Sequence, residues 1–444
     1  MKFDQFQHAG QTDVGVKRSH NQDAFAIQLA ADADHFETTG HIFLVADGMG
    51  GHAVGEKASA QAIREIPHTY LKHAAEGPAP ALRRSFLETN TSIFSVGQEN
   101  PEFRGLGTTA TALVLRADGA WVGHVGDSRV YRIRGDVLQQ LSFDHSLVWA
   151  LARQQGVDPD ELSDVRKNVI IRSLGPDSLV QVDVEGPYPL EPNDVFILCS
   201  DGLSNPLQPD EIGSIAANLP PSEACKFLIE LANLRGGPDN ITSIIVRVTR
   251  DGDSSTIIPA TTATRPNVFK RLLSRGLRSM PWPLLVLLMG FALAIGFIIF
   301  KVEEIPGGSA LFVLAAISIG VGLIGLGIHS QREQPDDQED DNPPTKANIY
   351  KQHACAIDQT AIDKFNKIDA LLLQHLEKND WPFEVKKHAL HLSESRKLYT
   401  SGDASGGFRE ICRAIQILAA CFNQHRHKEE SFQPNWNTPP DEAG

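Results

Sequence analysis

The chain has 444 residues, enough for two or three domains, and a formal net charge of −14. A charge this negative argues against a nucleic-acid-binding protein. Five cysteines without a C-x-x-C pair provide neither a disulfide framework nor a zinc site. Residues 1–10 are polar and contain no signal peptide, so we expect the first domain to begin in the cytosol.

The first candidate site follows a short apolar strand. Residues 1–40 contain strand-like pieces with Arg18 in a polar loop, and the apolar run 42–46 then ends at Asp47. Gly48 follows, so an aspartate side chain and a free carbonyl could bind the same hard cation. Taken alone, this stretch is explained equally well by a tight turn between a strand and a helix.

Helices and then strands are predicted further along the chain. Apolar residues at helical spacing predict helices over 55–73 and 80–98, both packed on a sheet. Strands separated by Asp-Gly and Gly-Asp pairs follow between 107 and 141, and they predict an antiparallel meander with Asp127 on a connection. A third helix is expected at 147–155.

Aspartates at strand ends recur. A strand-like run ends at Asp127 and another at Asp201, while Asp239 lies in a turn just before the predicted strand 241–248. A helix near 222–235 would bring the chain back to the same edge. Carboxylate and carbonyl oxygens are the ligands that Mg²⁺ and Mn²⁺ prefer, so the pattern predicts a site for more than one cation.

Six short motifs occur in order over roughly residues 8–250. They are Thr12–Gly15 with Arg18 and Asn21–Asp23, Asp47–His52, Gly105–Thr109, Val125–Arg129, Ser200–Leu203 and Asp239–Thr242. In this order they resemble a bacterial PPM-type (protein phosphatase type 2C) metal-dependent serine/threonine protein phosphatase. The resemblance implies an α+β domain at 1–250 with two packed antiparallel sheets flanked by helices.

The resemblance also implies a site for two Mn²⁺ or Mg²⁺ ions with a weaker third. The two ions would share one aspartate and activate a bridging water as the nucleophile. The implied metal ligands are Asp47, Gly48, Asp201, Asp239, Asp127 and Asp23. Arg18 is the implied catalytic residue and binds the substrate phosphate, because its planar fork grips two oxygens at once.

Three positions bear on how closely the chain follows the family. Gln22 replaces an acidic residue that many members carry, which puts metal affinity in doubt. Met49 replaces a histidine that serves as a candidate general acid, so the proton donor is left between metal-bound water and His52. His145 lies in residues 142–175, the implied substrate-selecting flap, where a structural role is as plausible as acid–base catalysis.

Two apolar runs predict a membrane hairpin. After a Ser/Thr-rich and then basic linker at 251–280, residues 282–300 and 310–328 each contain 19 residues without a charge, enough to cross a bilayer. Basic residues precede the first run and so orient the phosphatase domain to the cytoplasm. We therefore predict two transmembrane helices within 281–328, contact with lipid, and a multi-pass protein of the inner membrane with both termini cytoplasmic.

The rest of the chain predicts a separate module. An acidic linker at 329–345 precedes three helical stripes at 346–427, read as a small all-α bundle, and 428–444 is predicted to be a disordered tail. The sequence does not state the function of the bundle, and binding of a protein partner is a hypothesis.

Three functions were weighed. The first is a phosphatase that acts on phosphoproteins made by a serine/threonine kinase. An aspartate-nucleophile phosphohydrolase using Asp251 and Asp253 is disfavoured because Ser255 stands where Thr or Val is needed. A catalytically dead phosphatase scaffold that acts as a membrane-held binding protein is disfavoured because the implied metal aspartates are all present.

Overall fold

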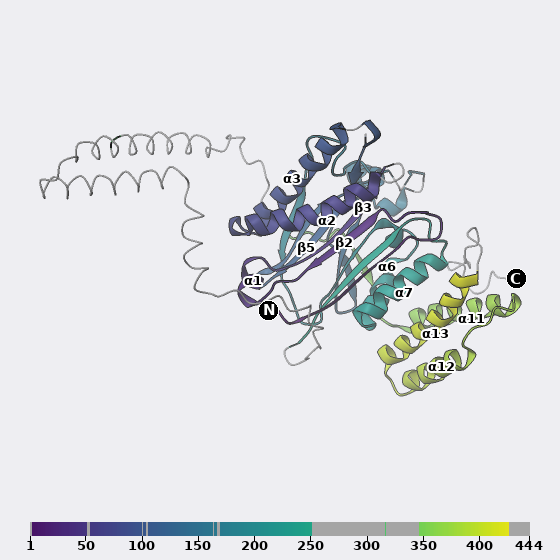
Figure 1. The fold of residues 1–444 in the computed structure, drawn as a ribbon. Helices are drawn as coiled ribbons and strands as arrows, with labels where there is room; N and C mark the ends of the chain where they lie inside the picture. Colours follow the sequence, from purple (N-terminus) through teal and green to yellow (C-terminus); the bar gives the residue numbers. More distant parts are fainter. Residues whose placement is uncertain are drawn as a thin grey trace, which may run out of the picture. The chain divides into compact units, whose positions relative to one another are not determined.

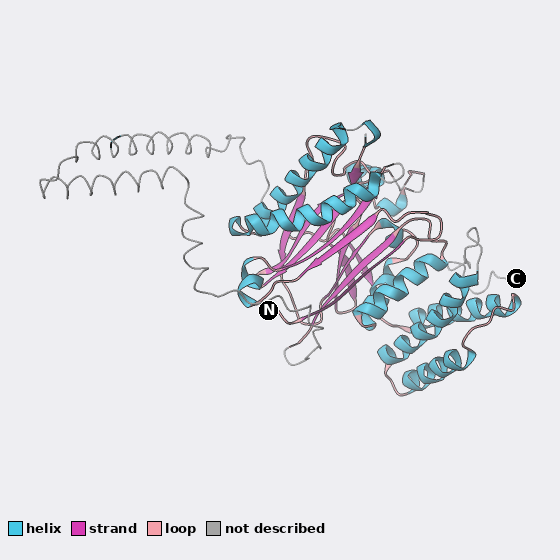
Figure 2. Cartoon of the chain, in the orientation of Figure 1, coloured by secondary structure: helices cyan, strands magenta, loops and turns pink. Residues whose placement is uncertain are grey.

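The computed structural model describes residues 2–250, except 51–53, 100, 104, 163, 167 and 168, together with 316 and 346–425. The described strands form two antiparallel sheets, and Figure 2 shows them between layers of helices. Sheet A has the order β1 (Phe6–Asp13), β11 (Ile241–Val248), β10 (Val195–Cys199), β7 (Arg129–Arg134), β8 (Val137–Gln140) and β12 (Lys351–Ala354). Sheet B has the order β2 (Asp23–Gln28), β3 (His41–Met49), β5 (Ala110–Arg116), β6 (Gly119–Val125) and β9 (Asp183–Tyr188), and β4 (Gly107–Thr108) pairs with β3.

Helices cover the outer faces of both sheets (Figure 1). Helices α2 (Val54–His73) and α3 (Pro78–Glu99) pack on sheet B, and α6 (Pro209–Asn218) and α7 (Pro221–Leu234) pack on sheet A. The remaining helices are α1 (Ala33–Thr38), α4 (Leu147–Gln155), α5 (Asp201–Ser204), α11 (Gln359–Lys378), α12 (Val385–Thr400) and α13 (Ala404–His425). Three short 3₁₀ helices are η1 (Ala74–Glu76), η2 (Pro101–Phe103) and η3 (Pro159–Glu161).

Strand β3 shows why its sequence is apolar at every position from 42 to 46. Ile42 and Leu44 belong to the core under α2 and α3, whereas Phe43 and Val45 belong to the core between the two sheets. Successive side chains of a strand point to opposite faces, so a strand covered on both faces needs no polar side. The predicted phosphatase architecture of two packed antiparallel sheets flanked by helices is confirmed.

The predicted meander between 107 and 141 is wrong in one respect. Strands β5 and β6 pair in sheet B, but the next pair, β7 and β8, belongs to sheet A. The chain crosses between the sheets at residues 126–128, where Gly126 has a φ of 119° and a Cβ would lie 2.5 Å from Thr109. Asp127 therefore lies on a connection, as predicted, but this connection joins the two sheets.

The predicted membrane location is corrected. Within the ranges described above, no helix is long and apolar enough to cross a bilayer. This finding overturns the predicted multi-pass location in the inner membrane with both termini cytoplasmic. The two predicted spans, apart from residue 316, lie outside the described residues. Their prediction depended on the hydropathy and length of two runs alone, and no helix that the structure describes has that combination.

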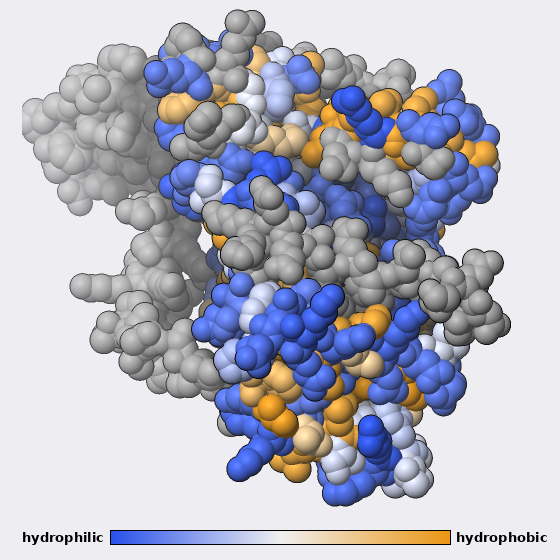
Figure 3. All heavy atoms as spheres, turned by 90° about the vertical axis from the view of Figure 1, so that its right-hand side faces the viewer, coloured by the Kyte–Doolittle hydropathy of each residue, from blue (hydrophilic) through white to orange (hydrophobic). Residues whose placement is uncertain are grey.

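The C-terminal region is not purely helical. The predicted helices are found as α11, α12 and α13, but β12 precedes them and extends sheet A beside β8. Phe365 and Phe408 share one buried cluster with Phe227 of α7, and the Phe227 and Phe365 ring centroids lie 6.5 Å apart. On the outside, Figure 3 shows patches of hydrophobic residues broken up by hydrophilic ones. The described C-terminal helices therefore share a core with the helices and strands of residues 1–250.

A shared core predicts shared stability. Phe365→Ala should lower the free energy of unfolding by about 3–5 kcal/mol, because it opens a cavity between α7 and α11. Amide hydrogen exchange should become faster in α7 as well as in α11. Leu390→Ala is the control, since this side chain on α12 is 63% exposed and its loss should cost less than about 0.5 kcal/mol. Unchanged exchange in α7 would contradict the shared core.

Candidate metal centre

The predicted aspartates lie at one edge of the sandwich, where strands of both sheets end. Asp23 begins β2 and is the register partner of Asp47 in β3. Asp201 directly follows β10, and Asp239 lies just before the neighbouring strand β11. Asp127 lies on the crossing between the sheets. Antiparallel strands bring residues from remote parts of the sequence to one edge, so the expected convergence is present.

The carboxyl groups are close enough to repel one another. Burial raises the pKa of Asp23 to about 7, with further contributions from the charges of Asp201 and Asp239. Burial and the charge of Asp201 raise the pKa of Asp127 to about 8. The pKa of Asp201 rises to about 6, and that of Asp47 well above its usual range, through burial and neighbouring carboxylates. A group of buried like charges needs protons or cations to be stable.

Three carboxylate oxygens lack a hydrogen-bond partner. Within the described residues, one buried oxygen each of Asp23, Asp127 and Asp201 accepts no hydrogen bond. Buried polar atoms are normally paired, so these oxygens are available to a ligand. The donor set, made of carboxylates and the backbone carbonyl of Gly48, has the chemistry that Mg²⁺ and Mn²⁺ prefer. The residues present therefore fit divalent cations.

Among the described residues, no three histidine, cysteine, aspartate or glutamate side chains form a closed cage for one ion. Mg²⁺ usually takes only one or two carboxylates and completes its shell with water.

Neutral side chains hold the site in place. The Ser200 and Thr242 hydroxyls each donate to Asp23 Oδ2 at 2.7 Å, which leaves Asp23 Oδ1 free. Asn240 belongs to the motif Asp239–Thr242, but the sequence predicted no role for it. Its amide nitrogen donates to the carbonyls of Val14 and His20, at 2.8 and 2.9 Å, and so fixes the loop that carries Arg18. The only signal for this role in the sequence is that a side chain able to donate hydrogen bonds, that of Asn240, directly follows Asp239.

Two glycines allow the close approach of backbone segments. A Cβ at Gly202 would lie 1.9 Å from the carbonyl oxygen of Asn240, so only glycine brings the start of α5 against the turn with Asp239. A Cβ at Gly48 would lie 2.2 Å from the carbonyl oxygen of Gly55. Strand β3 continues through Asp47 to Met49, because Gly48 pairs with Thr108 of β4.

Arg18 lies beside the carboxylates. Its Nη2 donates to Asp239 Oδ2 at 2.8 Å, and its side chain is half exposed. The guanidinium therefore stays at the rim of the site, where an incoming anion can reach it.

The two histidines considered as acids have different outcomes. His145 is buried, accepts from the Gly126 N–H through Nδ1 at 3.0 Å, and pairs through Nε2 with Asp183 at 2.9 Å. It supports the crossing that carries Asp127, which is a structural role. His52 lies outside the described residues.

Gln22 makes hydrogen bonds through both its side chain and its backbone. Its side-chain amide donates to the Gly50 backbone carbonyl, and its backbone carbonyl accepts from the Ser59 hydroxyl.

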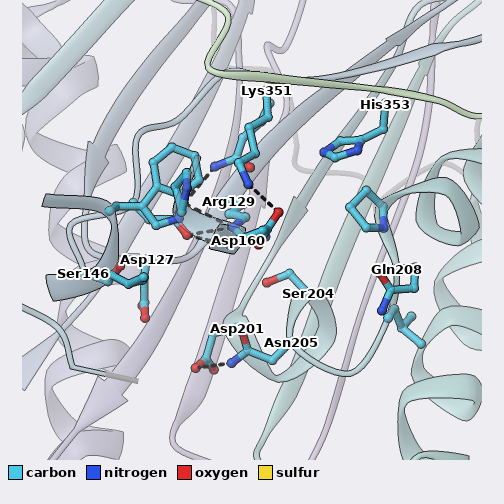
Figure 4. Close-up of a pocket in the computed structure, with 17 residues that line it drawn as sticks. Asp127, Arg129, Ser146, Asp160, Asp201, Ser204, Asn205, Gln208, Lys351 and His353 are labelled. Carbon is cyan, nitrogen blue, oxygen red and sulfur yellow. Dashed lines mark hydrogen bonds and ion pairs between the residues drawn. The ribbon is translucent and has the colours of Figure 1, made fainter. Parts of the chain in front are cut away.

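A pocket of about 430 Å³ opens beside two of the aspartates. Figure 4 shows Asp201, which accepts a hydrogen bond from Asn205, on the side of the pocket away from Lys351 and His353. Asp127 and Asp201 both line the pocket, so it is continuous with the candidate metal centre.

The chain is similar to known proteins over part of its length. A family model described as protein phosphatase 2C matches residues 15–231. Serine/threonine phosphatase stp of Listeria innocua is 34% identical over 241 residues, which cover 53% of this chain and 93% of that protein. Protein phosphatase PhpP of Streptococcus pneumoniae is 34% identical over 248 residues, which cover 54% of this chain and 96% of that protein.

Solved structures with similar sequences include the Mycobacterium tuberculosis serine/threonine phosphatase PstP/Ppp. It is 28% identical, covers 55% of this chain and 99% of its own, and has a TM-score of 0.48. The catalytic domain of PstP in complex with two manganese ions is 29% identical with the same coverage and a TM-score of 0.46.

The chain belongs to the protein phosphatase 2C family, because it covers almost the whole length of relatives more than 30% identical to it. It is a protein-serine/threonine phosphatase. Residues beyond 231 lie outside the family match.

The raised pKa values predict a pH-dependent effect of metal. In the presence of a chelator, the proton-binding carboxyls stabilise the fold at low pH, and this contribution is lost as pH rises through about 6 to 8. Added Mn²⁺ replaces the lost protons, so it should raise Tm more at pH 8 than at pH 5.5. Differential scanning calorimetry with and without Mn²⁺ measures both shifts.

Two variants control this measurement. Asp201→Asn should reduce the Mn²⁺-dependent shift at pH 8, and Asp118→Asn, in a turn remote from the cluster, should leave it unchanged. Equal shifts at both pH values in the unaltered protein would show that the cluster does not exchange protons for metal.

Proposed function

We propose that this phosphatase hydrolyses phosphoserine and phosphothreonine with two divalent cations, Mn²⁺ or Mg²⁺, held by the clustered aspartates. The observation that carries the proposal is the set of buried carboxylate oxygens of Asp23, Asp127 and Asp201, which have no hydrogen-bond partner in the described structure. Bound there, the cations would activate water for attack and offset charge on the phosphoryl group.

The aspartates have distinct proposed roles. Asp47 interacts with four other carboxylates, so it is the natural ligand to share between two cations. Asp201 and Asp239 would also bind one of these cations, with water in the rest of its shell, and the Gly48 carbonyl would bind the other. Asp127, at the side of the pocket, would bind a weaker third ion.

Arg18 would bind the phosphoryl group. Its planar fork can donate to two phosphate oxygens at once, which fixes the phosphorus in line with the attacking water. The present contact with Asp239 holds the guanidinium beside the metal ligands, so a phosphate entering the site would meet both. Its positive charge would then stabilise the transition state.

The proposed substrates are proteins that a serine/threonine kinase has phosphorylated. The leaving serine or threonine oxygen needs a proton. His145 is engaged with Gly126 and Asp183, so it is not the proposed donor. Water held at the metal centre and His52 are the proposed sources of the proton.

Loss of a metal ligand should abolish turnover. Asp201→Asn should lower kcat for a phosphopeptide by about 100-fold or more, because it removes a charged ligand from the shell. A chelator should have the same effect on the unaltered protein, and Mn²⁺ should reverse it. Phosphate release from a phosphothreonine peptide is the measurement. Full activity in both the variant and the chelated protein would contradict metal-dependent hydrolysis.

Loss of Arg18 should affect the same reaction through the substrate. Arg18→Ala should lower kcat/KM by about 100-fold without changing the Mn²⁺-dependent rise in Tm, because the arginine binds phosphate and no metal. Arg84→Ala is a matched control, since Arg84 is 48% exposed against 50% for Arg18 and is also paired with a carboxylate. Equal activity of the two variants would remove Arg18 from the mechanism.

A further inference from the structure

Residues 346–355 return to the phosphatase domain after the part of the chain that the structure does not describe. Strand β12 pairs antiparallel with β8 at the edge of sheet A, from Lys351 opposite Gln140 to Ala354 opposite Val137. The backbone N–H of Tyr350 donates to the Gln140 carbonyl at 2.9 Å, just before the strand begins. These residues lie well beyond position 231, where the family match ends.

Side chains fix this segment to sheet B as well. The Tyr350 hydroxyl donates to Glu185 of β9, and the Tyr188 hydroxyl donates to the Asn348 carbonyl at 2.7 Å. The Tyr350 ring contacts the Phe143 ring, with centroids 5.5 Å apart. The segment is therefore bound to both sheets, and these contacts hold it at the pocket.

Lys351 and His353 form one wall of the pocket beside Asp127 and Asp201 (Figure 4). They stand two residues apart on β12, so they lie on the same face of the strand, and Gln352 between them lies on the other. The His353 ring makes no hydrogen bond to the described residues and is free to bind a ligand. A region outside the matched sequence thus contributes side chains to the pocket that two of the candidate metal ligands also line.

Lys351 also binds the chain around η3 at the rim of the pocket. Its Nζ donates to Oδ1 of Asp158, which precedes η3, at 2.8 Å and to Oδ2 of Asp160, within η3, at 2.7 Å. The ammonium lies 5.4 Å from the centroid of the Trp149 ring, and only 13% of the side chain is exposed. Asp158 and Asp160 are 50% and 70% exposed, so these ion pairs position the rim more than they stabilise the fold.

The pocket suits a peptide. Its volume of about 430 Å³ is larger than a phosphate group requires. Neutral hydroxyl and amide side chains line it between the aspartates and β12, namely Ser146, Ser204, Asn205 and Gln208. Such groups can donate to and accept from a peptide backbone.

We propose that this pocket binds the polypeptide next to the phosphorylated residue of the substrate, with His353 as a specificity-determining contact and Lys351 as a positioning residue. The inference rests on the proposed function, because it assumes that the phosphoryl group sits at the aspartates. It assigns part of substrate selection to the C-terminal region of the chain. A small phosphate ester lacks the flanking polypeptide, so we expect its hydrolysis to be independent of both residues.

The test compares two substrates in the full-length chain with Mn²⁺ present. His353→Ala and Lys351→Met should each raise KM for a phosphothreonine peptide about fivefold to tenfold and leave kcat unchanged, because they remove binding that is equal in the ground and transition states. Neither variant should change kcat or KM for p-nitrophenyl phosphate. Lys351→Arg keeps the charge and the ion pairs and should restore the KM of the unaltered protein.

Matched controls separate this role from simple anchoring. Lys364→Met removes a second lysine that joins the C-terminal region to the phosphatase domain, through Asp210 and Glu211, but it does not line this pocket. Gln352→Ala changes the outer face of β12. Both variants should leave the peptide KM unchanged, and Tm of every variant is measured alongside.

The outcomes are distinguishable. An unchanged peptide KM in His353→Ala and Lys351→Met overturns the inference, and so does an equal loss of activity on the ester and the peptide. A peptide KM raised as much by Lys364→Met as by Lys351→Met also overturns it, since anchoring alone would then explain the effect. Failure of the unaltered protein to hydrolyse either substrate overturns the proposed function first, and the inference falls with it.

Discussion

The main constraint on this structure is the mutual repulsion of carboxylates that lie at one edge of two sheets. Burial and the charges of four other aspartates raise the pKa of Asp47. Such a cluster opposes folding at neutral pH unless protons or cations neutralise it. Within the described residues, three of these aspartates each keep a buried oxygen without a hydrogen-bond partner. Unpaired buried oxygens are typical of a binding site and not of a structural core.

The fold brings these side chains together through neighbouring strand ends. Strands β10 and β11 are adjacent in sheet A, so the aspartates after one and before the other meet, although 38 positions separate Asp201 from Asp239. Gly202 permits this contact because no side chain would fit against Asn240. Hydrogen bonds from Ser200 and Thr242 then hold Asp23 in the same place. Neutral donors can stabilise the site without cancelling the charge that attracts cations.

Much of this was accessible from the sequence, and the exceptions have physical reasons. Apolar runs that end in aspartate predicted the strand ends and the convergence of the site. The glycine turn before Asp127 gave no sign that the chain changes sheets there, because a hairpin and a crossing use the same residues. Strand β12 was missed because Lys351 to Ala354 has no apolar alternation, and its strand conformation depends on pairing with β8. The role of Asn240 lies in contacts with remote backbone carbonyls. Hydropathy alone predicted a membrane hairpin, and the described helices do not support it.

The C-terminal region extends the same logic beyond the matched family. Its helices share a core with α7, and its strand reaches the pocket next to the aspartates. The central claim is that these carboxylates hold two divalent cations close together. Anomalous diffraction from crystals soaked in Mn²⁺ tests this claim most directly. Two peaks about 3.5–4 Å apart, both in contact with Asp47, are the predicted result. No peak at this edge of the sheets, in crystals that hold Mn²⁺ elsewhere, would contradict the account.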